Sequence, residues 1–252
     1  SCGWKCNATP RSDEMPRSWF AVLLATQSTR AQSEAERTQQ LLLKEAVDLQ
    51  ARNATGNGKF PLSTGAWFLT DSYVSNAKRR CDDCSYMFDT ALAGCLASFF
   101  QGRTLTELGA GIGRYAKAIR ASGLTGRVIA YDGMPDVESK SGGAVRYADL
   151  STKENAIAQS DWAMTLEVAE HVPKRFEATF LQNIDRANRR GVVLSWSRLQ
   201  GSRGHVNPKG PKAVISTFVQ RGYEHDRNAT RMLRKCATHP NFRNCILVFR
   251  HR

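Results

Sequence analysis

The segment that decides the fold is Leu105-Thr-Glu-Leu-Gly-Ala-Gly-Ile-Gly-Arg-Tyr115, in which an apolar stretch passes through three alternate glycines into a helix-forming stretch. Glycine lets the backbone turn tightly and approach a ligand where a Cβ would collide. The spacing Gly109-x-Gly111-x-Gly113 alone is weak evidence, because a dinucleotide-binding loop or a plain turn can also show it. Its flanks add Glu107, two residues before the first glycine, and Val128-Ile-Ala-Tyr-Asp132, a second apolar stretch that ends in a carboxylate.

Outward from this loop, helix-like and strand-like stretches alternate from about residue 86 to the C-terminus. This order predicts an α/β fold, namely a Rossmann-like, doubly wound, mostly parallel sheet with helices on both faces. Ligands of such sheets bind outside the carboxyl ends of the strands. The predicted strands are 104–108, 127–132, 144–147, 161–166, 191–196 and 244–250, and the predicted helices are 86–101, 113–122, 152–159, 173–187 and 209–221.

The N-terminal part of the chain has a different composition. Residues 28–52 contain neither proline nor glycine and predict one amphipathic helix, which Asn53-Ala-Thr-Gly-Asn-Gly58 ends. The longest early apolar run, residues 19–25, is too short to span a bilayer. We therefore expect an N-terminal helical stem or accessory segment over 1–60 and one catalytic domain over 61–252.

The glycine loop and its flanks resemble the class I S-adenosylmethionine-dependent methyltransferases, whose loop is an acidic residue followed by Gly-x-Gly-x-Gly. The resemblance covers about residues 86–197. The alternatives are a nicotinamide-dependent enzyme, which more often shows Gly-x-Gly-x-x-Gly, and a cofactor-free pseudoenzyme. The resemblance implies S-adenosylmethionine as cofactor, with Asp132 on its ribose hydroxyls and Asp149-Leu150 near its adenine. The cofactor-binding residues that it implies are Glu107, Gly109, Gly111, Gly113, Asp132, Gly133, Asp149, Leu150 and Glu167.

Ligand-type side chains gather after the fourth predicted strand. Glu167, Glu170 and His171 lie within five residues, and His205 follows the fifth strand in Gly204-His-Val-Asn207. This pattern is similar to the metal site of the small-RNA 3′-terminal 2′-O-methyltransferases, in which two glutamates and two histidines bind magnesium. The resemblance implies that Glu167, Glu170, His171 and His205 hold a divalent cation, Mg²⁺ or Mn²⁺.

Other interpretations of these residues stay open. In a metal-free site His171 or His205 is the catalytic general base. A purely structural interpretation has Glu170 capping the following helix and His171 packing in the core. The Ser195-Trp196 pair and the loop 201–207 depart from the RNA-modifying family, so a nucleic-acid substrate is not carried over. We expect Trp196 to form a wall of the acceptor pocket.

The acceptor follows from the chemistry of the cluster and from the charge. A hydroxyl is a poor nucleophile at neutral pH, and metal coordination lowers its pKa, so the cluster favours O-methylation of a diol such as a sugar. The net charge is +13, and the whole excess lies in residues 174–252, with 17 Lys and Arg against 4 Asp and Glu. This bias favours an anionic partner or a glycan, with an RNA terminus as the alternative and a scaffold that only binds cofactor as a third hypothesis.

The cysteines and glycosylation sequons suggest a compartment. Sequons at Asn53 and Asn228 favour the lumen of the secretory pathway, in the Golgi, whereas a reduced cytoplasmic protein is the alternative. Cys95 lies midway along an apolar helix and is expected to be buried and inert. A zinc site using Cys81, Cys84 and two later cysteines is a further alternative. The close spacing of the seven cysteines suggests the bridges Cys2–Cys6, Cys81–Cys84 and Cys236–Cys245.

Overall fold

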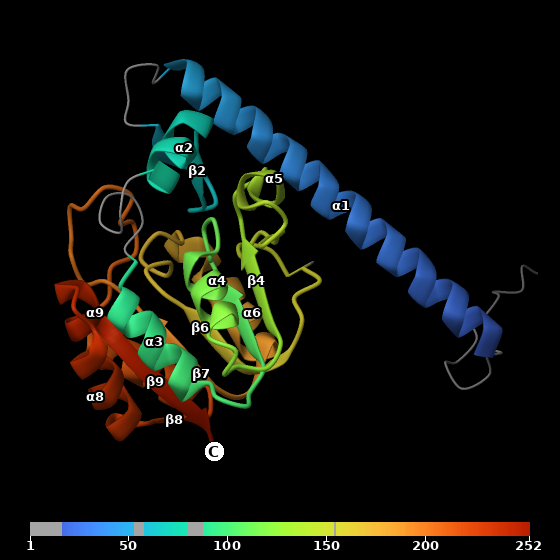
Figure 1. Cartoon of the computed structure of the whole chain (residues 1–252). Coiled ribbons are helices and arrows are strands. Elements are labelled where there is room, and N and C mark those ends of the chain that lie inside the picture. Colours follow the sequence, from blue (N-terminus) through green and yellow to red (C-terminus); the bar gives the residue numbers. More distant parts are fainter. Residues whose placement is uncertain (1–16, 53–57, 80–87, 154) are drawn as a thin grey trace, which may run out of the picture.

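The protein folds around one seven-stranded sheet (Figure 1). The structure is a computed structural model that describes residues 17–52, 58–79, 88–153 and 155–252, with side chains described outside 17–33 and 76–79. The strand order is β5-β4-β3-β6-β7-β9-β8, and β9 is the one strand of this sheet that runs in the opposite direction to the others. The predicted mostly parallel sheet is therefore confirmed. The strands are β3 Leu105–Leu108, β4 Val128–Asp132, β5 Arg146–Tyr147, β6 Ser160–Thr165, β7 Asn188–Ser195, β8 Tyr223–His225 and β9 Ile246–His251.

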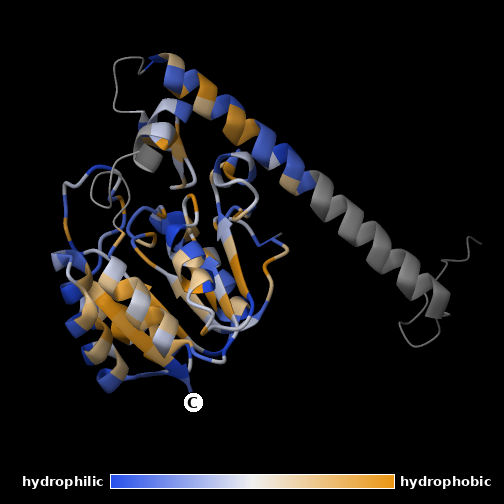
Figure 2. Cartoon of the chain, viewed as in Figure 1, coloured by the Kyte–Doolittle hydropathy of each residue, from blue (hydrophilic) through white to orange (hydrophobic). Residues whose placement is uncertain are grey.

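Helices cover both faces of this sheet, as predicted. Successive strand residues point to opposite faces, so Val193 of β7 packs in one apolar cluster while Val192 and Leu194 pack in the other. The first cluster contains side chains of α3, α4 and α8, and the second contains side chains of α6 and α7. Figure 2 shows these strands as apolar ribbons beside amphipathic helices. The helices are α3 Thr90–Phe99, α4 Arg114–Ala121, α5 Val137–Ser141, α6 Glu177–Ala187, α7 Pro211–Gln220, α8 Arg227–Cys236 and α9 Pro240–Cys245.

The predicted helix over 152–159 is wrong, since the described residues of that stretch form bends and irregular backbone. Polar side chains there bond the local backbone instead. The Asn155 amide donates to the carbonyls of Asp149 and Thr152, and the Asp149 carboxylate accepts from the Ser151 N–H. Such bonds offer the backbone a turn in place of a helix.

The N-terminal segment begins with α1 Arg17–Arg52, which starts well before the predicted helix of 28–52. Its second half is anchored to the domain: the Glu45 carboxylate accepts from the N–H and the hydroxyl of Ser63, and the Gln39 amide donates to the Pro135 carbonyl. Among the described helices, none has the length and apolar composition that crossing a bilayer requires. The predicted boundary at residue 60 falls inside a strand, and the division into a stem and a catalytic domain stays a prediction.

A small hairpin and a helix connect α1 to the sheet domain. Strand β1 Lys59–Pro61 pairs antiparallel with β2 Trp67–Leu69, and α2 Asp71–Arg79 follows. The turn between the two strands carries Gly65 with φ +92°, a left-handed conformation that glycine adopts without strain. This hairpin lies beside the sheet end that carries the functional residues, as shown below.

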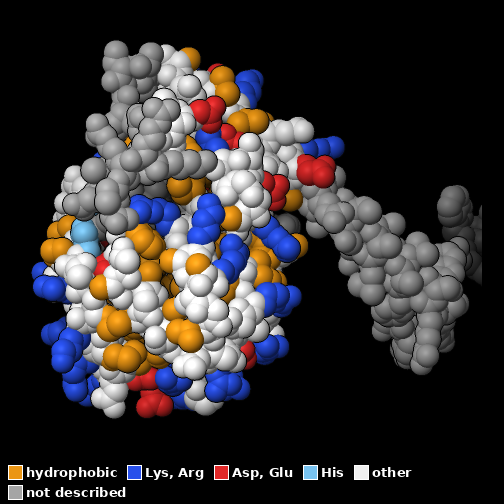
Figure 3. All heavy atoms as spheres, in the orientation of Figure 1, with side chains coloured by type: hydrophobic (Ala, Val, Ile, Leu, Met, Phe, Trp, Pro, Cys, Tyr) orange, Lys and Arg blue, Asp and Glu red, His pale blue; other side chains and the backbone are white. Residues whose placement is uncertain are grey.

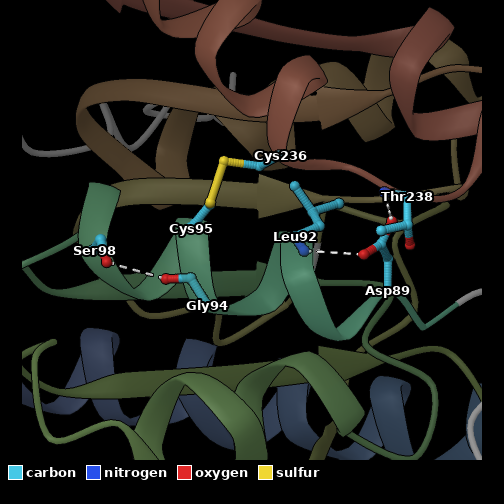
Figure 4. Close-up of a disulfide and its surroundings, with 7 residues drawn as sticks. All are labelled: Asp89, Leu92, Gly94, Cys95, Ser98, Cys236 and Thr238. Atoms are coloured by element: carbon cyan, nitrogen blue, oxygen red, sulfur yellow. Dashed lines mark hydrogen bonds between the residues drawn. A yellow bond between two sulfur atoms is a disulfide. The ribbon is translucent and has the colours of Figure 1, made fainter.

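One disulfide, Cys95–Cys236, joins the middle of α3 to the end of α8 (Figure 4). Its partners are 141 residues apart, and closing a loop of that length stabilises the fold by about 2–5 kcal/mol. The predicted Cys236–Cys245 bridge is wrong, because α8 packs against α3 and brings Cys236 to Cys95, while Cys245 is a buried free thiol. The expectation that Cys95 is inert is therefore also wrong. The predicted Cys2–Cys6 and Cys81–Cys84 bridges lie outside the described residues.

Asp89 ties α3 to the segment before α9, and this contact predicts a pH dependence of stability. Its Oδ1 accepts from the Leu92 N–H and its Oδ2 from the Thr238 N–H (Figure 4). The same Oδ2 also accepts from the His239 N–H. Burial raises the pKa of Asp89, but the backbone hydrogen bonds outweigh burial and hold that pKa below its ordinary value. Ionised Asp89 therefore stabilises the fold above the unfolded-state pKa of about 3.9, and this stabilisation is lost as the pH falls through the folded pKa.

We expect Asp89→Asn to lower the free energy of unfolding at neutral pH by about 1–3 kcal/mol, because it weakens hydrogen bonds made to a charged acceptor. Thermal unfolding at pH about 7 and at pH about 3 checks this, and the variant should approach the wild type at the acidic pH. The control is Asp71→Asn, which changes a side chain that is 95% exposed. An equal difference at both pH values would contradict the prediction.

Candidate functional site

The glycine loop lies between β3 and α4, at the carboxyl end of the sheet. Gly109, Gly111 and Gly113 all have positive φ, which explains the three glycines at this spacing. Asp132, at the end of β4, holds the loop: its Oδ2 accepts from the Gly111 N–H at 2.7 Å and its Oδ1 accepts from the Met134 N–H at 2.8 Å. Burial raises the pKa of Asp132, while these two bonds act against that rise. The loop and the end of β4 are thus one preformed unit.

A cavity opens beside this unit, with about 520 Å³ of empty space that includes the solvent at its mouth. Its lining contains six of the nine residues that the sequence predicts to bind cofactor: Gly109, Asp132, Gly133, Asp149, Leu150 and Glu167. The other three, Glu107, Gly111 and Gly113, lie outside the lining. Glu107 is buried behind the loop, and burial raises its pKa to about 8.

The cavity also has a wall that the sequence analysis missed. Residues 64–67, the turn and first strand residue of the β1–β2 hairpin, line it opposite the glycine loop. A Cβ at Gly65 would lie 2.2 Å from the His171 carbonyl oxygen, so only glycine allows the hairpin to approach this closely. The available signal was a Ser-Thr-Gly turn between two short apolar stretches, which predicts a hairpin but not where the hairpin packs.

A polar cluster adjoins the cavity. One ligand atom each of Glu170, His171 and His205 lies within 4.8 Å of the others. The backbone holds the two segments together, because the N–H groups of Val206 and Asn207 both donate to the Glu170 carbonyl at 2.9 Å. The two histidine rings meet edge to face with centroids 4.9 Å apart, and the His171 ring meets that of Trp67 in the same way.

The hydrogen bonds of the two histidine rings leave one nitrogen of each ring free to bind a cation. Each histidine places Nδ1 against a backbone carbonyl, His171 against Gly204 at 2.9 Å and His205 against Leu199 at 2.8 Å. A carbonyl only accepts, so each Nδ1 donates its proton there, and in the neutral form of the ring the lone pair is on Nε2. Burial lowers the pKa of His171 to about 4, and the charges of His205 and Lys59 act in the same direction.

Glu170 is fully buried, and neither of its carboxylate oxygens has a hydrogen-bond partner among the described residues. Burial raises its pKa to about 8, and the Glu167 carboxylate contributes. The interpretation of Glu170 as a helix cap is therefore wrong, since α6 begins only at Glu177 and the Glu170 carboxylate bonds no backbone N–H. A buried carboxylate without a partner is costly, so Glu170 is held protonated, as its raised pKa indicates, unless a cation binds beside it.

Glu167 is set apart from this cluster. Its Oε1 accepts from the Ser195 hydroxyl at 2.8 Å, and its Oε2 faces the Asn241 amide at 3.5 Å. Glu167 has φ +55° and is the one non-glycine residue of positive φ in the described part of the chain, a strained conformation that is typical of functional sites. The structure thus brings three of the four predicted metal ligands together and leaves Glu167 outside that group, in the lining of the cavity.

The prediction for Trp196 is wrong. Its side chain is 1% exposed and packs in the core cluster with α6 and α7, and its indole N–H donates to the Asn207 carbonyl at 2.7 Å. The buried indole holds the loop that carries His205, so Trp196 positions the site from behind. The side chain of an aromatic residue at a strand end can point into the cavity or into the core beside the sheet. Trp196 points into the core cluster that contains side chains of α6 and α7.

No protein-family model and no curated protein sequence matches the chain at a significant level. The solved structures give the fold. Magnesium protoporphyrin IX methyltransferase from Synechocystis, with bound SAH, superposes with a TM-score of 0.53 at 11% identity, over 72% of this chain and 95% of that one. A TehB-like SAM-dependent methyltransferase from Corynebacterium glutamicum gives 0.51 at 14% identity, over 73% and 100%. The chain therefore has the Rossmann-like fold of the class I SAM-dependent methyltransferases.

Proposed function

We propose that this protein is an S-adenosylmethionine-dependent methyltransferase. The observation that carries the proposal is the Asp132 carboxylate, bound to the glycine loop and facing a cavity of about 520 Å³ at the carboxyl end of the sheet. The fold supports it, because a solved structure of the same fold holds SAH. Calorimetric titration of the intact chain with S-adenosylmethionine is the direct test.

Each part of the cavity has a role in binding this cofactor. Asp132 accepts hydrogen bonds from the ribose hydroxyls, since an ionised carboxylate offers about four lone-pair sites and two backbone N–H groups occupy only two of them. Gly109, the loop residue that lines the cavity, contacts the amino-acid end, and Asp149 with Leu150 borders the adenine. Gly111 and Gly113 act by giving the loop its conformation. The buried Glu107 supports the loop without contacting the cavity.

The polar cluster fits a divalent cation, Mg²⁺ or Mn²⁺. The orphaned, buried Glu170 carboxylate and the Nε2 lone pairs of His171 and His205 are the expected donors, and Glu167 becomes the fourth by releasing Ser195 or Asn241. A bound cation lowers the pKa of a coordinated hydroxyl and fixes its direction. The geometry favours this proposal over a metal-free one, because the buried Glu170 carboxylate has no hydrogen-bond partner among the described residues and has a ligand atom within 4.8 Å of one on each histidine.

We propose O-methylation as the reaction. The carbon of the methyl group passes from sulfur to the acceptor oxygen, the sulfonium becomes a neutral thioether, and the hydroxyl proton leaves to solvent. The protein aligns the hydroxyl with the sulfonium, excludes water and supports deprotonation. A cation held by the three ligands of the cluster has further coordination positions, and a pair of neighbouring hydroxyls, as on a sugar or glycan, can fill two of them. The second candidate is 2′-O-methylation of RNA, which the basic C-terminal third favours.

We propose the lumen of the secretory pathway, in the Golgi, as the compartment. The Cys95–Cys236 disulfide and the exposed sequon residue Asn228 at the start of α8 support this. Mass spectrometry of the protein from its native source should find Cys95 and Cys236 joined, Cys245 as a free thiol, and glycan on Asn228. Three free thiols with an unmodified Asn228 would place the protein in the cytoplasm instead.

A further inference from the structure

A second hollow lies against the cofactor cavity. It is an open groove of about 670 Å³ between the β1–β2 hairpin, the residues that precede α6 and the loop that carries His205. Gly65 and His171 line both the groove and the cavity. A molecule in the groove would therefore lie next to the cavity proposed for the methyl donor, with His171 between them.

The groove carries positive charge. Lys174 and Arg175 line it and are exposed, no Asp or Glu is among its lining residues, and neither cation forms an ion pair within the described chain. The Arg175 guanidinium donates to the Ser63 carbonyl, which directs it along the wall of the groove. A carbonyl carries no net negative charge, so this hydrogen bond does not neutralise the guanidinium. The Arg175 guanidinium therefore remains available to an anion.

The surroundings add to this charge. The Arg203 guanidinium donates to the Lys59 carbonyl at 3.0 Å, and burial together with the Arg203 charge lowers the pKa of Lys59. Two carboxylates lie near these segments: Glu45 accepts from Ser63, one of the lining residues, and Glu177 pairs with Lys209 and accepts from Asn207. Within the lining itself, Lys174 and Arg175 are the Lys and Arg side chains and no carboxylate opposes them.

The rim of the groove is apolar. Val206 is 59% exposed, and Pro61 and Pro173 also line the groove. A ligand with a compact ring would cover these side chains while its charged group contacts Lys174 and Arg175. The combination of cations and apolar surface is the composition of a binding site for a small organic anion.

We propose that this groove binds the methyl acceptor, and that the acceptor is a ring diol carrying an anionic group, a phosphate or a carboxylate, which Lys174 and Arg175 hold. The inference rests on the proposed methyltransferase function and adds the site and the charge of its substrate. In this arrangement the anion is fixed at the outer end of the groove, and the hydroxyls lie at His171, next to Glu170 and His205.

Calorimetric titration of the full chain with three sugars tests this. The probes are glucuronate, phosphorylated glucose and glucose, which share neighbouring hydroxyls and differ in charge. We expect at least one of the anions to bind and glucose to bind at least about tenfold more weakly, because only the anions reach the two cations. The tighter of the two anions identifies the charged group as a carboxylate or a phosphate.

Matched variants separate the groove from general attraction. The double variant Lys174→Gln/Arg175→Gln should weaken binding of the anionic sugar about tenfold or more. The control Arg227→Gln/Arg231→Gln removes the same charge from α8, where Lys and Arg side chains gather at the lower left of Figure 3, and should leave that binding unchanged. All four side chains are exposed, so both variants should keep the thermal midpoint of the wild type within a few degrees.

Three results would overturn the proposal: no binding of either anionic sugar at millimolar concentration, equal binding of glucose, or equal losses in the two double variants. Titration of the same preparations with S-adenosylmethionine keeps this test apart from that of the proposed function. A chain that binds the anion at Lys174 and Arg175 but not S-adenosylmethionine would refute methyl transfer and leave an anion site. A chain that binds only S-adenosylmethionine would refute the groove alone.

Discussion

Replacing Asp132 by alanine is expected to weaken S-adenosylmethionine binding by about a hundredfold or more. The carboxylate does two things at once: it faces the cavity where the ribose is proposed to lie, and its two oxygens hold the N–H groups of Gly111 and Met134. Hydrogen bonds to a charged group contribute about 1.5–3 kcal/mol each, so losing the ribose contacts alone accounts for the effect. Calorimetry on the folded variant measures it.

Two further variants make the result specific. Asp161→Ala removes a carboxylate that also bonds a backbone N–H, that of Thr104, but at the opposite end of the sheet, so it should lower stability and spare cofactor affinity. Asp132→Asn keeps an oxygen for one backbone N–H and should lie between the wild type and the alanine variant. Unchanged affinity in a folded Asp132→Ala protein would contradict the proposal that S-adenosylmethionine binds in this cavity.

Replacing Glu170 by glutamine is expected to weaken Mn²⁺ binding by about a hundredfold or more and to abolish turnover. The change keeps the shape of a side chain that is fully buried but removes the charge that compensates a cation. Titration of metal-free protein with Mn²⁺ measures this without any acceptor. In an activity assay, chelator should stop turnover, Mg²⁺ or Mn²⁺ should restore it, and S-adenosylmethionine binding should persist because the glycine loop and Asp132 require no metal.

Glu167→Gln and Glu224→Gln are the comparisons for this experiment. Glu167 is held by Ser195 and Asn241, so its loss should weaken Mn²⁺ binding less than the loss of Glu170, and the exposed Glu224 should have no effect. Equal Mn²⁺ affinity in the wild type and Glu170→Gln would contradict the metal site. Full turnover of metal-free protein in excess chelator would leave His171 or His205 as the general base, with a histidine-like pH profile.

The sequence predicted the residues whose position follows from their own strand. Asp132 is the last residue of β4 and Asp149 lies two residues after β5, and the parallel sheet brings such strand ends to one edge. The glycine loop was recognisable because positive φ at three alternate positions restricts the residue type. The grouping of His205 with Glu170 could also be expected, since β6 and β7 are neighbours.

Contacts between distant segments were not predictable in the same way. Cys95 and Cys236 are 141 residues apart, and short spacing pointed to the wrong partner, Cys245. The hairpin wall at 64–67 depends on where α1 and the hairpin dock, which no local periodicity encodes. Trp196 could pack on either side of its strand, and the apolar cluster of α6 and α7 decided the side.

The contact of Gly65 with the His171 carbonyl limits how this enzyme could change its substrate. At that point the boundary between cavity and groove is main chain meeting main chain, with no room for a Cβ. A substitution at Gly65 therefore cannot adjust the boundary between the cavity and the groove at this point. New acceptors should instead be obtained by varying the outer residues Lys174, Arg175 and Val206, and a library restricted to these positions should retain the fold and the methyl donor while its substrate range shifts.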